Sequence, residues 1–331
     1  MHCELAVPGL FGGAADARAP ALELLLARGR SSAGESRTLE GWLQHAFGLE
    51  ARPLPAGALT LLASDADPGD ACWVRADPVH LRLARDRLIV VPDAAFTVTE
   101  QEAKALVEAL NSHFTGVLSL RVADARRWCA RLEEELALDA PCALACAGRD
   151  VDLTARIGGE PGKRWSRLLN EAQMLLHAHP VNQAREERGE PPVNSLWLWG
   201  AGRAPRGLKA SWQSVGAADP LALGLAKAAG AQPRSLPPSA EEWLAQAPED
   251  GRHLLVLDAL RAPLALGQDA EYRECIDMLE KRWFAPLLAA LRAGRAGMVS
   301  VHVPDAAASF EIIRGDLRRF WRRPRALERY A

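Results

Sequence analysis

The sequence predicts an α/β fold in which a mostly parallel or mixed central sheet is covered by helices on both faces. Short apolar runs alternate with helical patterns through most of the chain, which is the order expected when helices connect the strands of one sheet. In the run SLWLW (195–199) both alternating faces are apolar after Ser195, as in a strand that is buried on both faces. The 331 residues, of which 49% are hydrophobic and 25% charged, suffice for a sizeable core.

Eight apolar runs are predicted to be strands. They are CELAV (3–7), LTLLA (59–63), CWVRA (72–76), RLIVV (87–91), GVLSLRV (116–122), SLWLW (195–199), HLLVLD (253–258) and GMVSVHV (297–303). The N-terminal part, which includes a loop rich in Gly and Ala at 11–20, is expected to be irregular. No internal repeat or long polar linker interrupts the pattern. We therefore expect a single α/β domain over residues 1–331.

Capping residues mark the helices between these strands. Thr99 begins a capping box with Glu102, and an amphipathic helix is predicted to follow. A long helical pattern over about 163–188 must be kinked or split by Pro180, which cannot donate a helix hydrogen bond. Further helices are predicted at 219–230 and 269–292.

Composition and charge exclude several classes of protein. The net charge of −2 gives no general attraction to nucleic acid, and no apolar stretch approaches the length of a membrane helix. The N-terminus lacks the basic region of a secretory signal. Of the six cysteines only Cys142 and Cys146 are close in sequence, without a second pair to complete a zinc site. We expect a cytoplasmic protein with reduced thiols, no metal or other cofactor, and no nucleic-acid or membrane partner.

The C-terminal segment RGDLRRFWRRPRALERYA interleaves arginines with Phe320 and Trp321. Such a mixture can stack on and neutralise nucleic acid. A terminal helix that packs Leu317, Phe320 and Trp321 on the body of the protein is the commoner outcome, and we expect that one.

The first candidate site follows the strand SLWLW. We expect Trp197 and Trp199 to be buried, one on each face of a central strand. Gly200 and Gly202 then lie at the carboxyl end of that strand, where α/β sheets bind ligands, and their backbone amides could approach an anion beside Arg203. The alternative is a glycine turn needed only to reverse the chain, with both indoles in the core.

Polar residues upstream could complete this site. Asn182 and Arg185 are three residues apart, so they share a helix face just past Pro180, and Asn194 opens the strand. With the glycine turn they predict a pocket for a small phosphorylated or carboxylate ligand. They could equally cap helices, with an internal glutamate pairing with Arg185.

A second polar cluster lies between two apolar runs, in RADPVHLRLARD. Its members are Arg75, Asp77, His80 and Arg82, followed by Arg85 and Asp86. Asp77 before Pro78 is typical of a turn, and His80 beside Asp77 could act as an oriented general base. The alternative is an ion-paired hairpin with no chemical role.

Three segments carry a resemblance to a known family: NEAQMLLHAHPVN (170–182), REERGEPPVNSLWLWGAGR (185–203) and RADPVHLRLARD (75–86). They resemble bacterial RpfE-type regulatory proteins and the cofactor-independent, archaeal-type phosphoglycerate mutases of the alkaline phosphatase superfamily. A weaker likeness extends to FWRR near the C-terminus, so it covers most of the chain. The resemblance implies an alkaline-phosphatase-like α/β fold.

The resemblance also implies a Ser or Thr nucleophile and two metal ions held by Asp and His, and this chain departs from that pattern. The first strand is normally followed by an Asp, but here AVPGL follows, and no Ser appears before Ser31. Asp258 is retained without a His nearby, and the expected Asp-His pair is reduced to His302 and Asp305. Further aspartates stand in predicted loops, at Asp16, Asp65, Asp67 and Asp70.

Three functions follow from this departure. The first is a non-catalytic relative of the phosphoglycerate mutases that regulates another protein or binds a metabolite. The second is an active phosphoryl-transfer enzyme, a mutase or phosphatase, with relocated metal ligands. The third is a metal-free enzyme that uses His80 or His177 as acid and base. The sequence names neither the ligand, the protein partner, the pathway nor the oligomeric state.

Overall fold

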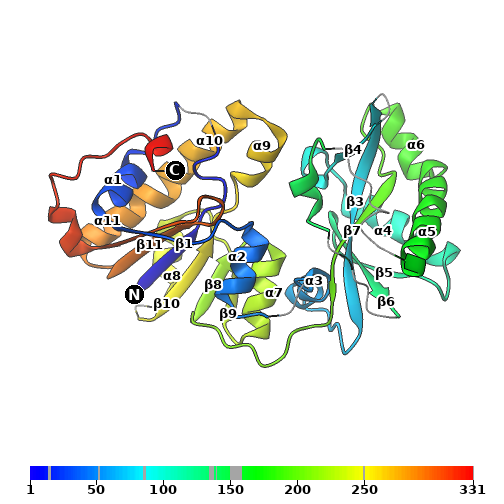
Figure 1. The fold of residues 1–331 in the computed structure, drawn as a ribbon, viewed down its shortest axis with the longest axis horizontal. Helices are drawn as coiled ribbons and strands as arrows, with labels where there is room; N and C mark the ends of the chain where they lie inside the picture. Colours follow the sequence, from blue (N-terminus) through cyan, green and yellow to red (C-terminus); the bar gives the residue numbers. More distant parts are fainter. Residues whose placement is uncertain are drawn as a thin grey trace. The chain divides into compact units, whose positions relative to one another are not determined.

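The computed structural model describes residues 1–13, 16–50, 53–84, 87–133, 138, 140–149, 159–248 and 250–330, so Arg85 and Asp86 of the second polar cluster lie outside the described residues. Internal contacts divide the chain into two compact units. Unit 1 comprises residues 1–49 and 207–331, and unit 2 comprises residues 50–206. In Figure 1 the blue N-terminal segment and the yellow to red C-terminal segment therefore belong to unit 1, and the cyan and green segment between them belongs to unit 2. We expected one domain; the difference arises because unit 2 has a sheet of its own.

Unit 1 is a mixed sheet of seven strands in the order β2-β12-β11-β1-β10-β8-β9. The strands are β1 (His2–Ala6), β2 (Arg30–Ala33), β8 (Ser214–Ala217), β9 (Gln232–Ser235), β10 (Arg252–Val256), β11 (Met298–Val303) and β12 (Ala308–Ile313). The five strands from β11 to β9 are parallel, whereas β12 and β2 run antiparallel to their neighbours. The predicted α/β class with a mixed sheet is confirmed.

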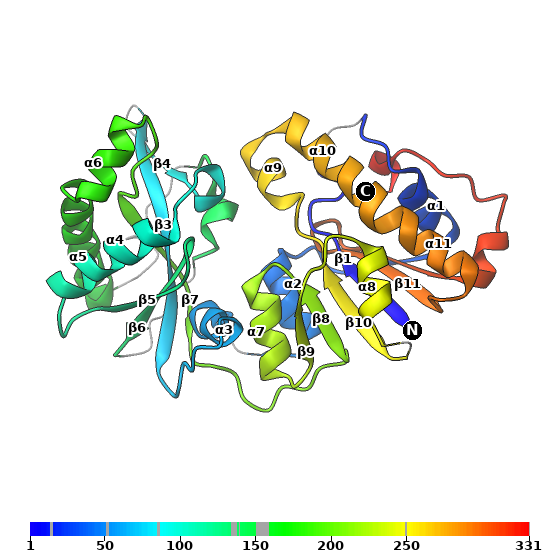
Figure 2. The same cartoon turned by 180° about the vertical axis from the view of Figure 1, so that it is seen from behind.

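Helices cover the buried strands of unit 1. They are α1 (Pro20–Arg28), α2 (Leu39–Ala46), α7 (Pro220–Ala228), α8 (Ala240–Gln246), α9 (Arg261–Leu266), α10 (Asp269–Leu279) and α11 (Ala285–Ala293). A π-helical turn, Glu280–Phe284, joins α10 to α11. Figure 2 shows α8 and α11 in front of the sheet, and α1 packs on α11. Four of the five residues of β1 and of β10 are buried, so both faces of these strands are covered, as the apolar runs predict.

Unit 2 is built on an antiparallel sheet that the sequence pattern did not predict. Its strands are β3 (Cys72–Ala84), β4 (Arg87–Val91), β5 (Ser119–Asp124), β6 (Arg127–Leu132) and β7 (Ser195–Gly202). The order is β4-β3-β6-β5, and β7 also pairs with β3. The helices are α3 (Ala56–Ala63), α4 (Glu100–His113), α5 (Gly159–His177) and α6 (Pro180–Glu187). Figure 1 shows α3 on one side of the β3–β7 ribbon and α4, α5 and α6 on the other.

Local signals placed several elements of unit 2 correctly. The capping box of Thr99 and Glu102 is formed at the start of α4. The long helical pattern is split at Pro180, where α6 begins after α5 ends. Here Pro180 occupies the first turn of the new helix, in which its missing N–H costs nothing.

Two predictions of secondary structure in unit 2 are wrong. LTLLA belongs to helix α3, whose residues Ala56–Leu61 are all buried, and a short run that is apolar all round cannot distinguish a buried strand from a buried helix. Asp77 and Pro78 lie inside β3 rather than in a turn. Residues 76–79 of β3 pair only with β7, because β6 pairs up to Arg75 and β4 from His80 onward. Pro78 has no N–H to donate and fits this gap.

The C-terminal segment also departs from the prediction. A 3₁₀ helix ends at Arg318, and the rings of Phe320 and Trp321 are 78% and 66% exposed instead of packed on the body. The segment is held by arginines: Arg319 and Arg322 donate to the backbone carbonyls of Arg28 and Gly29 at 3.1 and 2.7 Å. Among the described residues, none of the helices combines the length and hydropathy that crossing a bilayer requires.

Candidate functional site

The carboxyl edge of the parallel strands in unit 1 is where the sequence resemblance implies two metal ions. Strand β1 ends at Ala6, and the loop that follows carries no acidic side chain at Val7, Pro8 or Gly9. The N–H of Gly9 donates to Asp305 Oδ1 at 2.8 Å, and Gly9 has a φ of +84°. The hydroxyl of Tyr272 donates to the Gly9 carbonyl at 2.8 Å, so neutral groups and one carboxylate fix this loop.

A guanidinium lies among the carboxylates at the same edge. Arg261 contacts Glu40 Oε1 at 2.5 Å and lies 4.0 Å from Asp219 Oδ2. Burial alone would raise the pKa of Glu40, but Arg261 holds that pKa below its ordinary value. Asp219 also caps helix α7 by accepting from the N–H of Leu221 at 2.8 Å. Its carboxylate is therefore already hydrogen-bonded within the fold.

The retained histidine is paired as well. His302 Nε2 lies 3.5 Å from the buried Glu4 Oε2, and its Nδ1 lies 2.9 Å from the Ser309 hydroxyl. Glu4 also accepts from Arg252 Nε at 2.8 Å. Burial would raise the pKa of Glu4, but the neighbouring side chains of His302 and Arg252 lower it to about 2. Asp258 follows β10, and its carbonyl accepts from the N–H of Arg261 at 3.1 Å.

These residues do not fit two divalent ions. Such a pair needs roughly six to eight nitrogen and oxygen ligands fixed in space. In the part of the chain that the structure describes, no group of three His, Cys, Asp or Glu side chains could hold even one ion. Arg261 places a positive charge among the carboxylates of this edge.

The predicted pocket beside β7 is divided between the two ends of that strand. Asn182, Arg185 and Asn194 lie near its start, whereas Gly200, Gly202 and Arg203 lie at its end. Eight residues of strand span roughly 25 Å. The two groups of residues are therefore too far apart to hold one small anion.

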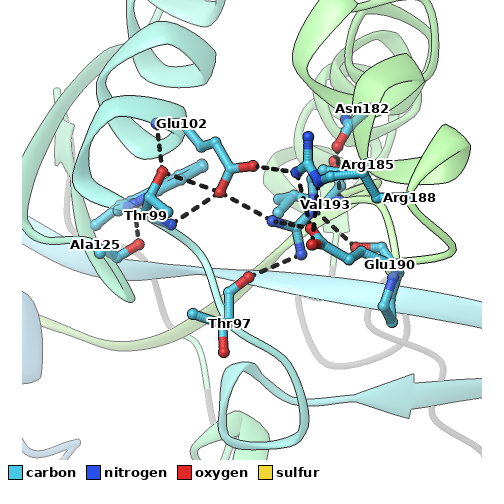
Figure 3. A network of polar contacts seen from close by, with 11 residues as sticks. Thr97, Thr99, Glu102, Ala125, Asn182, Arg185, Arg188, Glu190 and Val193 are labelled. Carbon is cyan, nitrogen blue, oxygen red and sulfur yellow. Dashed lines mark hydrogen bonds and ion pairs between the residues drawn. The ribbon is translucent and has the colours of Figure 1, made fainter.

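The group at the start of β7 is an internal network, shown in Figure 3. Arg185 is 1% exposed, and its guanidinium donates to Glu102 Oε2, the Thr97 carbonyl and the Pro191 carbonyl at 3.0, 2.8 and 2.9 Å. Arg188 adds a second contact to Glu102 at 3.0 Å (Figure 3). The buried guanidinium thus has the internal partners that burial of a charge requires.

The two asparagines connect strands and helices in the same region. Asn182 is 1% exposed, donates to the carbonyls of Leu176 and Val193 at 2.7 and 2.8 Å, and accepts from the Val193 N–H. Asn194 accepts from the Leu81 N–H at 2.7 Å and donates to the Leu81 carbonyl at 2.9 Å. Both amides are used within the fold, which is the alternative that the sequence left open.

The glycines at the end of β7 allow helix α3 to approach. Gly200 has a φ of +62°, and a Cβ there would lie 2.4 Å from Ala56 Cβ. A Cβ on Gly202 would lie 2.8 Å from Pro55 Cβ. Arg203 is exposed and hydrogen-bonds the Asp70 carbonyl. The pairing of β7 with β3 is antiparallel, so these glycines are not at the carboxyl end of a parallel strand, contrary to our expectation.

Both indoles of SLWLW are buried as predicted, but they share one face. Trp197 and Trp199 are 0% and 6% exposed. Residues two apart on a strand point the same way, so the expectation of one indole on each face was wrong. Trp199 Nε1 donates to Asp77 Oδ2 at 2.6 Å, and Trp197 Nε1 donates to the Pro141 carbonyl at 2.8 Å.

The second polar cluster is a buried ion pair and not a catalytic dyad. Arg75 and Asp77 are 5% and 4% exposed, and Arg75 Nε donates to Asp77 Oδ1 at 2.7 Å. His80, three residues from Asp77, points to the opposite face, where its Nδ1 lies 3.0 Å from the Pro192 carbonyl. Arg82 is exposed on β3.

Sequence reasoning missed one group near this pair. Burial and the neighbouring Asp77 carboxylate raise the pKa of Asp93 to about 6. Asp93 follows β4 and lies 3.8 Å from Arg126. Its sequence context, VVPDAAF, resembles an ordinary turn and gave no signal of this environment. The same holds for Glu40 and Arg261, which lie far apart in the chain.

Comparisons with known proteins find partial relatives, and no family model matches the chain. A probable 2,3-bisphosphoglycerate-independent phosphoglycerate mutase of Geobacter sulfurreducens is 48% identical over 48 residues, which are 14% of this chain and 12% of that protein. The 2,3-bisphosphoglycerate-independent phosphoglycerate mutase of Methanosarcina barkeri is 30% identical over 112 residues, 33% of this chain and 28% of that protein. The chain thus matches less than a third of the length of either relative.

Among solved structures, the PH0037 protein of Pyrococcus horikoshii aligns over 94% of this chain and 86% of its own, with a TM-score of 0.55 and 16% identity. This likeness concerns the fold. A cofactor-independent phosphoglycerate mutase from Thermoplasma acidophilum aligns over 95% of this chain and 90% of its own at a TM-score of 0.44 and 16% identity. The sequence matches relate the chain to cofactor-independent phosphoglycerate mutases.

Proposed function

We propose that this chain is a non-catalytic relative of the cofactor-independent phosphoglycerate mutases, of the RpfE-type regulatory kind, that acts in the bacterial cytoplasm by binding a small anionic metabolite or a protein partner. The observation that supports this is the carboxyl edge of the sheet in unit 1. There Val7, Pro8 and Gly9 follow β1 without a carboxylate, and Arg261 neutralises Glu40 beside Asp219.

The physical argument concerns charge. Two divalent ions attract a set of carboxylates, and that set repels itself when the ions are removed. In this chain the guanidinium of Arg261 compensates the charge of Glu40. This pairing supports a site that does not depend on metal ions, and without them phosphoryl transfer would lack the groups that stabilise its developing charge.

The test is metal analysis of the purified full-length chain, melting curves with chelator and with added Mn²⁺, and an assay of phosphoglycerate mutase and phosphatase activity. We expect no stoichiometric metal, an unchanged melting temperature and no turnover. About one or two ions per chain, with a melting temperature that falls on chelation, would support an enzyme with relocated ligands, because an ion bound to the native state stabilises it.

Turnover that persists in chelator would support the metal-free enzyme instead. In that case His80→Gln and His177→Gln would identify the acid or base. His177 is exposed near the end of α5, so its replacement should leave the fold intact.

A further inference from the structure

A cleft of about 800 Å³ opens on the sheet of unit 2, and of the residues singled out from the sequence it includes Arg203 and the loop aspartates Asp67 and Asp70. Its walls and floor include Asp67, Asp70, Trp73, Arg121, Arg131 and Arg203. The cleft lies on the face that α3 covers over β3, β6 and β7, towards β5. Its volume is in the range of small-molecule sites, roughly 300–1,000 Å³.

Strand register brings two arginines together on the floor of this cleft. Arg121 of β5 is opposite Cys129 of β6, and Arg131 of β6 is opposite Ser119 of β5. The two arginines are therefore diagonal neighbours on one face, with backbones about 7–8 Å apart. Two like charges so placed repel each other, and an anion bound between them would remove that repulsion.

An aromatic ring supports the same floor. Trp73 of β3 is opposite Arg131, and the Arg121 guanidinium lies over the Trp73 ring at 4.8 Å from its centroid. The ring fixes one guanidinium plane without neutralising its charge. The Arg121 guanidinium also donates a hydrogen bond to the Asp67 carbonyl at 3.3 Å.

The acidic residues of the cleft have other partners. Asp70 pairs with Arg206, Glu133 lies 3.4 Å from Arg164, and Asp67 Oδ1 accepts from the Gly69 N–H at 2.8 Å. Among the described residues, no carboxylate forms an ion pair with Arg121 or Arg131. Within the described part of the chain, the cleft therefore presents two guanidinium groups without an ion-pair partner, and the carboxylates that line it have other contacts.

We propose that this cleft binds a small phosphate dianion, as a phosphomonoester or inorganic phosphate, between Arg121 and Arg131. Two guanidinium groups can each donate a pair of hydrogen bonds to phosphate oxygens. The Ser119 hydroxyl lies in the same row of the sheet and adds a donor. The carboxylates of Asp67, Asp70 and Glu133, which also line the cleft, repel longer polyanions, so the ligand is a small molecule and not a nucleic acid. This inference uses none of the residues on which the proposed function depends.

The experiment is calorimetric titration of the full-length chain with inorganic phosphate and, separately, with glycerol 3-phosphate, against sodium chloride of equal ionic strength. Arg131 is exposed, so Arg131→Gln should fold. The matched control is Arg82→Gln, an exposed arginine of β3 outside the cleft. We expect Arg131→Gln to weaken binding at least about ten-fold, as the loss of one charge-assisted pair does, and Arg82→Gln to leave it unchanged.

Tighter binding of glycerol 3-phosphate identifies an organic ester as the ligand class, and equal binding identifies phosphate itself. No binding of either up to about 10 mM overturns the proposal, as does binding that Arg131→Gln and Arg82→Gln weaken equally. Metal content and mutase activity are measured on the same wild-type protein. Metal content and activity therefore test the proposed function, whereas the phosphate titrations test this site, so the failure of one can be told from the failure of the other.

Discussion

Replacing Gly200 with Ala tests why the two tryptophans of β7 are followed by glycine. Two costs are expected. The residue has a φ of +62°, and an L-residue in this left-handed region loses about 1–2 kcal/mol. The added methyl group would also lie 2.4 Å from Ala56 Cβ and 3.0 Å from the Leu54 carbonyl oxygen, and such overpacking costs about 1–3 kcal/mol more. The free energy of unfolding should fall by about 2–5 kcal/mol in total.

Gly189→Ala separates the two costs. Gly189 is also in unit 2 and has a φ of +72°, but a Cβ there meets nothing within 4 Å. Gly189→Ala should therefore lower the free energy of unfolding only by the cost of the left-handed backbone angle, about 1–2 kcal/mol. Adding Ala56→Gly to Gly200→Ala removes the closest colliding atom and should recover stability, with a coupling energy of about 1 kcal/mol or more.

Urea denaturation of the full-length variants, followed by tryptophan fluorescence, measures these differences. The reasoning is refuted if Gly200→Ala is no more destabilising than Gly189→Ala. Equal costs would mean that α3 does not approach β7 as closely as described, and the glycine would then be needed only for its backbone angle or for a ligand.

Three further predictions concern residues with contrasting environments. The pKa of Glu4 in the folded chain is about 2, below its ordinary value of 4.5, so its carboxylate contributes stability above about pH 4.5 that is lost as the pH falls towards 2. In Glu4→Gln the midpoint of urea unfolding should therefore fall less steeply between pH 4.5 and pH 2 than it does in the wild type. Arg185→Met should cost about 3–5 kcal/mol, because it removes the buried partner of Glu102 and leaves two carbonyls without donors. That loss should be equal with and without phosphate, whereas a loss seen only in phosphate would restore Arg185 as a ligand residue. Trp197→Ala should cost about 3–5 kcal/mol and Trp321→Ala less than about 0.5 kcal/mol, and similar values in thermal or urea unfolding would contradict the exposures described.

The sequence predicted those parts of the fold that depend on neighbours along the chain. The capping box of Thr99 and Glu102 and the helix break at Pro180 are local, and both are found where expected. Strands β1, β10 and β11 of unit 1 were found for the same reason, since strands buried on both faces form nearly continuous apolar runs. Strand β9, with the sequence QPRS, carries no such pattern and was missed.

The candidate sites depended on residues distant in sequence, and for this reason they were not predictable. Whether Gly200 serves a ligand or a helix is decided by Ala56, which no pattern near SLWLWG reveals. Likewise Arg185 pairs with Glu102 of another helix at 3.0 Å, as well as with the nearby Glu190 at 3.6 Å, and no local pattern reveals the distant partner. The placement of Trp197 and Trp199 on one face is different, because the two-residue period of a strand already required it.

The insertion of unit 2 within unit 1 has a consequence for synthesis. Strand β1 pairs with β10 and β11, which the ribosome makes last, whereas unit 2 is continuous over residues 50–206. At 5–20 residues per second, roughly 6–25 s separate the completion of unit 2 from that of unit 1. During this interval unit 2 can fold, whereas the apolar strand β1 has not yet paired with β10 and β11. The order of translation therefore separates the two halves of one hydrophobic core in time, and β1 is exposed to aggregation until β10 and β11 have been made.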